Sequence, residues 1–157
     1  MSSAWGIWLR WPEIAAAVGL PADLVTPFCG SIYGCNTPAS TEAGSAVLQG
    51  AGPERARQLL KEAGYKGEPV VLFHSQTSAL LNPIGMVVAA QLRRAGFNVQ
   101  IESRDSATMQ QRRFQRSAWS IVPIVVNGID LMNPLANPLV AGNCFETAPG
   151  WYCDPKM

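Results

Sequence analysis

The single histidine and the serine after it are the residues that could most simply supply a base and a nucleophile. His74 ends an apolar run at 70–73 that is typical of a buried strand, and Ser75 follows directly. Adjacent residues on a strand point to opposite faces, so this pair is poorly placed for proton transfer. A single histidine at a strand end is more often structural than catalytic.

The other patterns that usually carry catalysis are absent from the sequence. It has no G-x-S-x-G turn, no phosphate-binding glycine loop and no H-E-x-x-H helix. The carboxylates are scattered, and none pairs at helical spacing with a second metal-binding side chain. We therefore predict that the protein is not an enzyme and that it uses no cofactor and no metal ion.

Four cysteines fall in two close pairs, Cys29 with Cys35 and Cys144 with Cys153. Short loops between paired cysteines suggest local disulfides in an oxidising compartment. Free buried thiols are a second interpretation. A zinc site of all four is a third, although these spacings are wider than the usual C-x2–4-C knuckle.

A polar loop after the last predicted strand is the candidate ligand site. It contains Asn127, Gly128 and Asp130, directly after an apolar run at 121–126. Ligands of open α/β sheets bind outside the carboxyl ends of the strands. Asp130 can neutralise a cationic group such as a peptide amine, and backbone N–H groups near Gly128 can bind a carboxylate. An Asx turn that only caps nearby backbone is an equally weighted alternative.

Alternating helices and strands are expected to position this loop. The patterns predict a helix over 1–20, an irregular loop over 21–52, and then three helix–strand units over 53–126, with loop again over 127–157. The helices of these units are expected at 53–63, 82–95 and 106–116, and the strands at 70–73, 97–101 and 121–126. This order predicts a small α/β layer with right-handed crossovers. Pro123 makes the last strand bent or an edge.

Glycines and apolar stripes define the helices. Gly64 is expected to end the first of them in the left-handed conformation, Gly96 is expected to end the second, and Asn82 is expected to be an N-cap. The apolar faces are predicted to be Ala56, Leu59, Leu60 and Ala63 in the first unit, and Ile84, Val87, Val88, Leu92 and Ala95 in the second.

Bulk composition narrows the function classes. The chain has 157 residues, enough for one domain, with 48% hydrophobic and 15% charged residues. A net charge of +1 gives no electrostatic attraction to nucleic acid, and no apolar run is long enough to span a bilayer. Five arginines, at 93, 94, 112, 113 and 116, are interpreted as a solvated helix face.

The first eleven residues are apolar but lack a positive leader region and a clean cleavage site, so we do not interpret them as a signal peptide. A buried first segment is expected instead. Trp5, Trp8 and Trp11 recur at a spacing of three, so one helical face can carry all three.

Several motifs together resemble one family of transport proteins. Ala56-Arg-Gln-Leu-Leu-Lys-Glu-Ala-Gly-Tyr65 is similar to its A-x-x-L-L-x-x-A-G-Y signature, and the segment 91–99 resembles its q-L-x-x-x-G-i-x-V pattern. The segments 130–137 and 150–155 resemble its D-x-x-N-P-x-x-N and W-x-C-x-P motifs. The family is that of the peptide, dipeptide and nickel-type solute-binding proteins of ABC importers, the bacterial extracellular solute-binding proteins of family 5.

The resemblance implies one lobe of a type II periplasmic-binding-protein-like fold, with a small sheet and crossover helices. The chain looks like most of the second lobe, with the ligand held between this lobe and another. A peptide or similar small polar molecule is the implied cargo, ABC permease subunits are the implied partners, and the periplasm or cell exterior is the implied location. The cysteine pairs match the family's two short disulfides.

One departure from the family pattern bears on the cargo. Peptide binders carry an aromatic residue just ahead of the loop aspartate, whereas Val125 and Val126 stand there in this chain. A structural or protein-interaction role for a truncated or stand-alone α/β domain is the alternative function.

Overall fold

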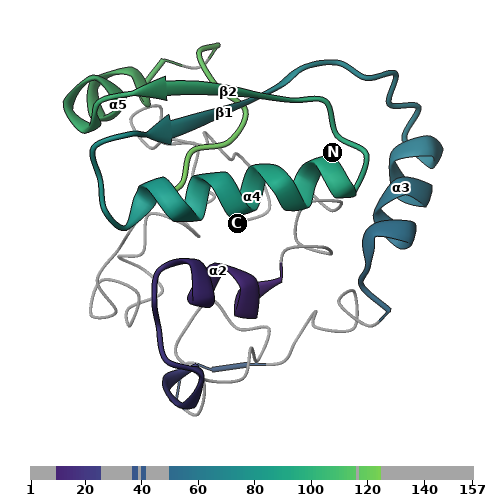
Figure 1. Cartoon of the computed structure of the whole chain (residues 1–157). Helices are drawn as coiled ribbons and strands as arrows, with labels where there is room; N and C mark the ends of the chain where they lie inside the picture. Colours follow the sequence, from purple (N-terminus) through teal and green to yellow (C-terminus); the bar gives the residue numbers. More distant parts are fainter. Residues whose placement is uncertain (1–9, 26–36, 39, 42–49, 116, 125–157) are drawn as a thin grey trace.

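The structure, a computed structural model, describes residues 10–25, 37–38, 40–41, 50–115 and 117–124. Figure 1 shows the arrangement of these residues. In chain order the elements are helix α2 (Trp11–Ala17), the 3-10 helix η1 (Ala22–Leu24), helix α3 (Pro53–Glu62), strand β1 (Val70–Ser75), helix α4 (Leu81–Arg94), strand β2 (Val99–Arg104) and helix α5 (Ser106–Arg112).

Strand β1 is the centre of the sheet. It pairs in parallel with β2, in a register that runs from Val70 opposite Val99 to Ser75 opposite Arg104, and α4 makes the crossover between them. On its other side, β1 meets Ile121 through an isolated parallel bridge at Leu72. The Ile121 N–H donates to the Val71 carbonyl at 3.0 Å. Of the predicted third strand, therefore, only Ile121 pairs with the sheet; residues 122–124 are not in a strand, and the last two predicted residues lie outside the described ranges.

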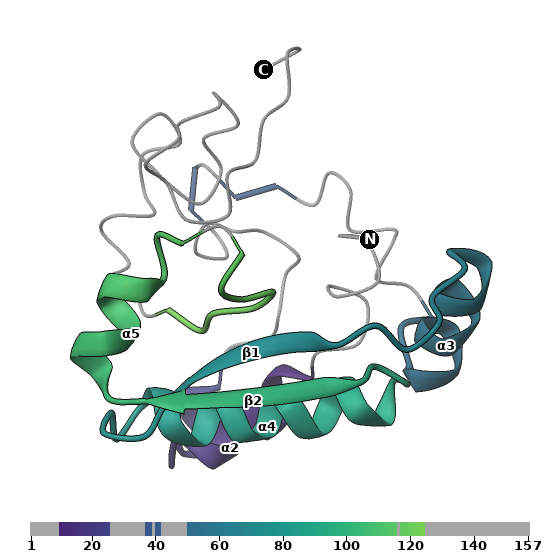
Figure 2. The same cartoon turned by 90° about the horizontal axis from the view of Figure 1, so that it is seen from above.

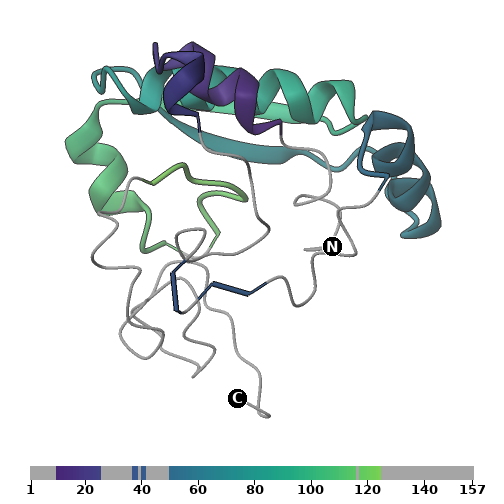
Figure 3. The ribbon, with the colours of Figure 1, turned by 90° about the horizontal axis from the view of Figure 1, so that it is seen from below.

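One face of the sheet is covered by two helices. Figures 2 and 3, which view the chain from opposite sides, place α2 and α4 together on this face. Side chains that alternate along the strands pack here, as period-two burial requires. The buried core comprises Ile14, Ala56, Leu60, Val70, Leu72, Val88, Ala89, Leu92, Ala95, Phe97 and Val99.

The second face of the sheet is covered by the segment that follows β2 (Figure 2). Phe73 is fully buried there, and its ring centroid lies 6.5 Å from that of Trp119. Met109 of α5 is also buried. The prediction that β1 is buried on both faces is thus confirmed, as expected for a continuous apolar run in a parallel sheet.

Three glycines end helices in the same way. Gly19, Gly64 and Gly96 have φ values of 74°, 70° and 98°, which only glycine adopts without strain. After Gly64, the N–H of Tyr65 donates back to the Leu60 carbonyl at 3.0 Å, and the Gly64 N–H donates to Lys61. This is the Schellman pattern, which satisfies carbonyls left over at the helix end. The predicted left-handed cap at Gly64 and the predicted helix end at Gly96 are confirmed.

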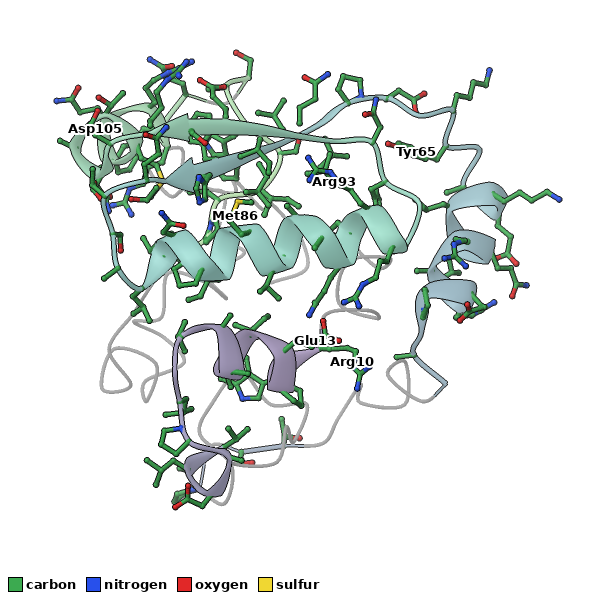
Figure 4. The ribbon with its side chains drawn as sticks, in the orientation of Figure 1. Arg10, Glu13, Tyr65, Met86, Arg93 and Asp105 are labelled. Atoms are coloured by element: carbon green, nitrogen blue, oxygen red, sulfur yellow. The ribbon has the colours of Figure 1, made fainter. Side chains whose placement is uncertain are left out.

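A buried amide joins α2 to α4. Gln91 of α4 accepts from the Arg10 N–H at 2.9 Å and donates to the Arg10 carbonyl and to the Glu13 carboxylate. Arg94 forms an ion pair with the same carboxylate, and Figure 4 shows Glu13 beside Arg10 at the start of α2. The hydrogen bond from Arg94, and after it the weaker effect of the bond from Gln91, lowers the pKa of the Glu13 carboxyl group.

The start of α4 differs from the prediction. Asn82 is not the N-cap, because the helix begins one residue earlier, at Leu81. The Ser78 hydroxyl accepts from the Leu81 N–H at 3.0 Å, and the Asn82 side chain donates to the Gln76 carbonyl at 3.1 Å. The N-cap position is Leu80, which has no capping side chain, so the turn before the helix is held by the Ser78 and Asn82 side chains instead.

Three smaller predictions also need correction. Ala63 is exposed and Leu59 is only half-buried, because α3 meets the core at the end of the sheet through just Ala56 and Leu60. Helix α5 ends at Arg112, short of the predicted 116. Trp11 is 44% exposed, so the expected buried first segment is wrong at this residue, because Ile14 and Ala15 make the packed face of α2. Trp5 and Trp8 lie outside the described residues.

We predict that Gly64→Ala lowers the free energy of unfolding by about 1–2 kcal/mol, the cost of a left-handed L-residue. A Cβ at this position meets no atom within 4 Å, so backbone strain is the whole effect. Gly64→Asn is the matched control and should cost less, because asparagine tolerates this conformation. Urea unfolding followed by circular dichroism measures both, and equal stability of Gly64→Ala and wild type would contradict the assigned cap.

Candidate functional site

The carboxyl ends of β1 and β2 meet at one edge of the sheet. Because the strands are parallel and of equal length in register, Ser75 and Arg104 end them side by side. The Gln76 N–H donates to the Arg104 carbonyl at 3.0 Å and extends the pairing by one bond. Residues 76–80 and Asp105 then turn the chain into α4 and α5, and Figure 4 shows Asp105 at this edge.

Three hydroxyl groups gather at this edge. The Ser75 and Ser106 oxygens are 2.7 Å apart, and the Thr77 oxygen lies 2.9 Å from that of Ser106. The backbone N–H of Ser106 also donates to the Thr77 hydroxyl at 3.1 Å. Ser75 is buried, Ser106 is half-buried and Thr77 is exposed, so the cluster runs from the interior to the surface.

Asp105 caps α5 at the same edge. Its carboxylate accepts from the Thr108 N–H at 2.9 Å and from the Thr108 hydroxyl at 2.6 Å. The bond from the Thr108 hydroxyl has the larger effect, and together the two bonds lower the pKa of the Asp105 carboxyl group. The carboxylate therefore stays charged at neutral pH and is committed to the helix start.

The segment that leads to the predicted ligand loop approaches from the far side of β1. Since Ile121 pairs with β1 in parallel, the chain enters this position running towards the same carboxyl edge. The residues predicted to bind ligand, Asn127, Gly128 and Asp130, lie outside the described residues. So do the four cysteines, Cys29, Cys35, Cys144 and Cys153, and both sets stay predictions.

The side chain of His74 connects β1 to β2 and to the start of α4. Its ring is 6% exposed, with Nδ1 3.0 Å from the Ser103 hydroxyl and Nε2 3.2 Å from the Asn82 carbonyl. A Cβ built on Gly85 of α4 would come within 2.7 Å of the ring, so the helix approaches closely here. Ser75 lies on the opposite face of β1, against Ser106. The structural interpretation of His74 agrees with this geometry.

The arginines tie elements together and do not form one solvated face. Arg93 and Arg94 of α4 are exposed as expected, and Arg93 donates to the Val99 carbonyl at 2.9 Å. Arg112 and Arg113 are half-buried, which the interpretation as a solvated face did not anticipate. Arg112 forms an ion pair with Glu102 of β2, and its guanidinium lies 5.5 Å from the Phe73 ring centroid. Arg116 lies outside the described residues.

A shallow depression of about 390 Å³ lies at the other end of the sheet, where the strands begin. It is lined by Arg57, Leu60, Lys61, Gly64, Tyr65, Lys66 and Gly96. Arg57 is already engaged there, because it donates to the Arg94 carbonyl at 2.7 Å and pairs with Glu54 at 3.3 Å.

Among the described residues, no three His, Cys, Asp or Glu side chains come together as a possible metal site. Within the described ranges, no helix has the length and apolar character needed to cross a bilayer.

The helices and the small parallel sheet have the fold of an α/β lobe of the periplasmic-binding-protein type. The substrate-binding protein CtaP of an ABC transporter from Listeria monocytogenes has the same fold, with a TM-score of 0.62 at 19% sequence identity. The match covers 76% of this chain and 25% of that protein.

Sequence comparison gives the family. The profile of the bacterial extracellular solute-binding proteins, family 5 (middle region) matches residues 15–142, so the chain belongs to this family. A probable peptide ABC transporter periplasmic-binding protein, y4tO of Sinorhizobium fredii (strain NBRC 101917 / NGR234), is 39% identical over 77 residues. That match covers 46% of this chain and 14% of the relative, so the chain corresponds to only a part of that protein.

Sequence reasoning missed the hydroxyl cluster and the cap at Asp105. The cap had a readable signal, since Asp105 stands three residues before Thr108 at the start of a helical stretch. Only the register of β1 against β2 brings Ser75 and Ser106 together, and no local pattern encodes that register.

We predict that Asp105 contributes to the acid sensitivity of the fold. Its pKa is lowered in the folded state, so its contribution is present above the ordinary pKa of about 4 and is lost as pH falls through the lower folded value. Urea midpoints measured between pH 7 and pH 3 should fall less in Asp105→Asn than in wild type. Asp23→Asn, on the exposed η1, is the matched control and should follow wild type. Parallel pH profiles for wild type and Asp105→Asn would contradict the capping role.

Proposed function

We propose that this chain forms part of an extracytoplasmic solute receptor that delivers its cargo to an ABC importer. Membership of family 5 over residues 15–142 is the observation that carries the proposal. The fold shared with a substrate-binding protein supports it, as does a relative that is described as a probable peptide ABC transporter periplasmic-binding protein.

The cargo we propose is a peptide or a similar small polar organic molecule, held at the carboxyl edge of the sheet. Open α/β sheets bind ligands outside this edge, and the described part of the edge carries hydroxyl groups. In our proposal Asn127, Gly128 and Asp130 contribute from the loop after the third strand. Asp130 neutralises a peptide amine, and the backbone near Gly128 binds a carboxylate.

A single lobe cannot enclose such a cargo, because small-ligand sites bury most of the ligand surface. We propose that a second lobe covers this edge on closure, in a hinge motion driven by ligand contacts to both lobes. The partners are then the permease subunits of the importer, and the location is the periplasm or the cell exterior. Within this lobe, we divide the chain into residues 1–52, residues 53–126 with the helix–strand units, and residues 127–157 with the ligand-side loop.

We predict that Asp130→Ala in the complete receptor weakens peptide binding roughly ten- to hundredfold, the range for a hydrogen bond to a charged group. Isothermal titration of tripeptides measures the effect. Asp23→Ala removes an exposed charge from η1 and is the matched control, expected to bind like wild type. Unchanged affinity of Asp130→Ala would reject it as a ligand contact, and a large loss of melting temperature would favour the capping-turn alternative.

We also predict disulfides between Cys29 and Cys35 and between Cys144 and Cys153 in the exported protein. Loops this short contribute about 2–3 kcal/mol each in the chain-entropy model. Intact mass after alkylation should show labelled cysteines only when the protein is first reduced, and peptide mapping should give these two pairs. Labelling without reduction, or a bound zinc ion, would contradict the assignment.

A further inference from the structure

We infer that Arg93 and Arg104 protect the outer edge of β2 against pairing with a strand of a second copy of this chain. Within the described residues β2 pairs only with β1, and Figure 2 shows it as the outermost strand, with β1 between it and the described segment after α5. An open edge of this kind can accept a strand from another molecule, and charged side chains are one of the devices that prevent such pairing.

The register shows which backbone groups of β2 point away from β1. The carbonyls of Asn98 and Arg104 accept from the N–H groups of Val70 and Gln76, so these carbonyls point towards β1. In a parallel pair, every second residue directs both its N–H and its C=O to the same neighbouring strand. The residues of β2 that alternate with these direct their N–H and C=O groups outward, and they are Val99, Ile101 and Ser103.

Two arginine side chains occupy the outward carbonyls at the two ends of this row. Arg93 of α4 donates to the Val99 carbonyl at 2.9 Å, and Arg104 donates to the Ser103 carbonyl at 3.0 Å. Pairing with a new strand requires these same carbonyl oxygens as acceptors. An incoming strand must therefore displace both guanidinium groups before it can align with the whole edge.

Both guanidinium groups are favoured at the edge by further interactions. Arg104 also pairs with Glu102 at 3.0 Å, and Arg112 pairs with the same carboxylate, so one negative charge between two positive ones leaves this end of the edge positive. Arg93 lies in the last turn of α4, where the helix dipole favours a cation. The side of β1, where Ile121 pairs, is then the side on which the sheet extends.

The protection is tested by sedimentation velocity of the complete receptor at a series of concentrations. Arg93→Met with Arg104→Met keeps two long side chains but removes their donors and charges. This double variant should associate where wild type does not, with a mean mass that rises with concentration towards that of a dimer or larger species. Arg55→Met with Lys66→Met makes the same change of charge at two exposed positions away from β2, and it should behave like wild type. Equal mean mass of the edge variant and wild type, or equal association of the control, overturns the inference.

Hydrogen exchange locates the contact on β2 and separates it from unfolding. In the associated edge variant, the outward Ile101 N–H should exchange at least about tenfold more slowly than in wild type, because the added strand must first open. The Gln100 N–H, which faces β1, should keep the same protection in both proteins. Unchanged exchange at Ile101 means association through another surface, and faster exchange at Gln100 means association through local unfolding. Either result overturns the inference.

Discussion

The left-handed turns at Gly64 and Gly96 determine where both strands begin, and the rest of the sheet depends on them. Each turn delivers an aromatic residue, Tyr65 or Phe97, and the two ring centroids lie 5.7 Å apart. The Tyr65 hydroxyl accepts from the Asn98 N–H at 3.0 Å and donates to the Glu68 carbonyl at 2.6 Å. Two helix–glycine–aromatic units are thereby locked together just ahead of the first residue pair of the ladder.

Because the two strands have the same length, the position of their first residues also determines where they end. Both strands run for six residues from the pair Val70–Val99, so they finish together at Ser75 and Arg104. That common end brings the last residue of β1 and the first residue of α5 within hydrogen-bond reach, although Ser75 and Ser106 are 31 positions apart. A change of one residue in the register would move Ser75 to the opposite face relative to its partner and would separate the hydroxyl groups.

The sequence predicted those features that have a local cause. The apolar run at 70–73 and the glycines after α3 and α4 have strong local preferences, and the structure agrees with them. At the start of α4 the local signal was misleading, because Asn82 is a strong capping residue but lies inside the helix and bonds the Gln76 carbonyl instead. The hydroxyl cluster could not be predicted at all, because it depends on pairing between distant segments.

The two ends of the sheet differ in how far their charged side chains are engaged by the protein's own backbone, and this difference favours the carboxyl edge as the ligand site. The depression at the starting end is rich in basic side chains, but two helices terminate there, and their carbonyls carry partial negative charge. Arg57 donates to one of those carbonyls, that of Arg94, and Lys61 lies in the last turn of α3, where a cation offsets the helix dipole. The positive charge at that end therefore compensates the protein's own backbone. At the carboxyl edge, Asp105 satisfies the start of α5, and the hydroxyl group of Thr77 is exposed at the surface.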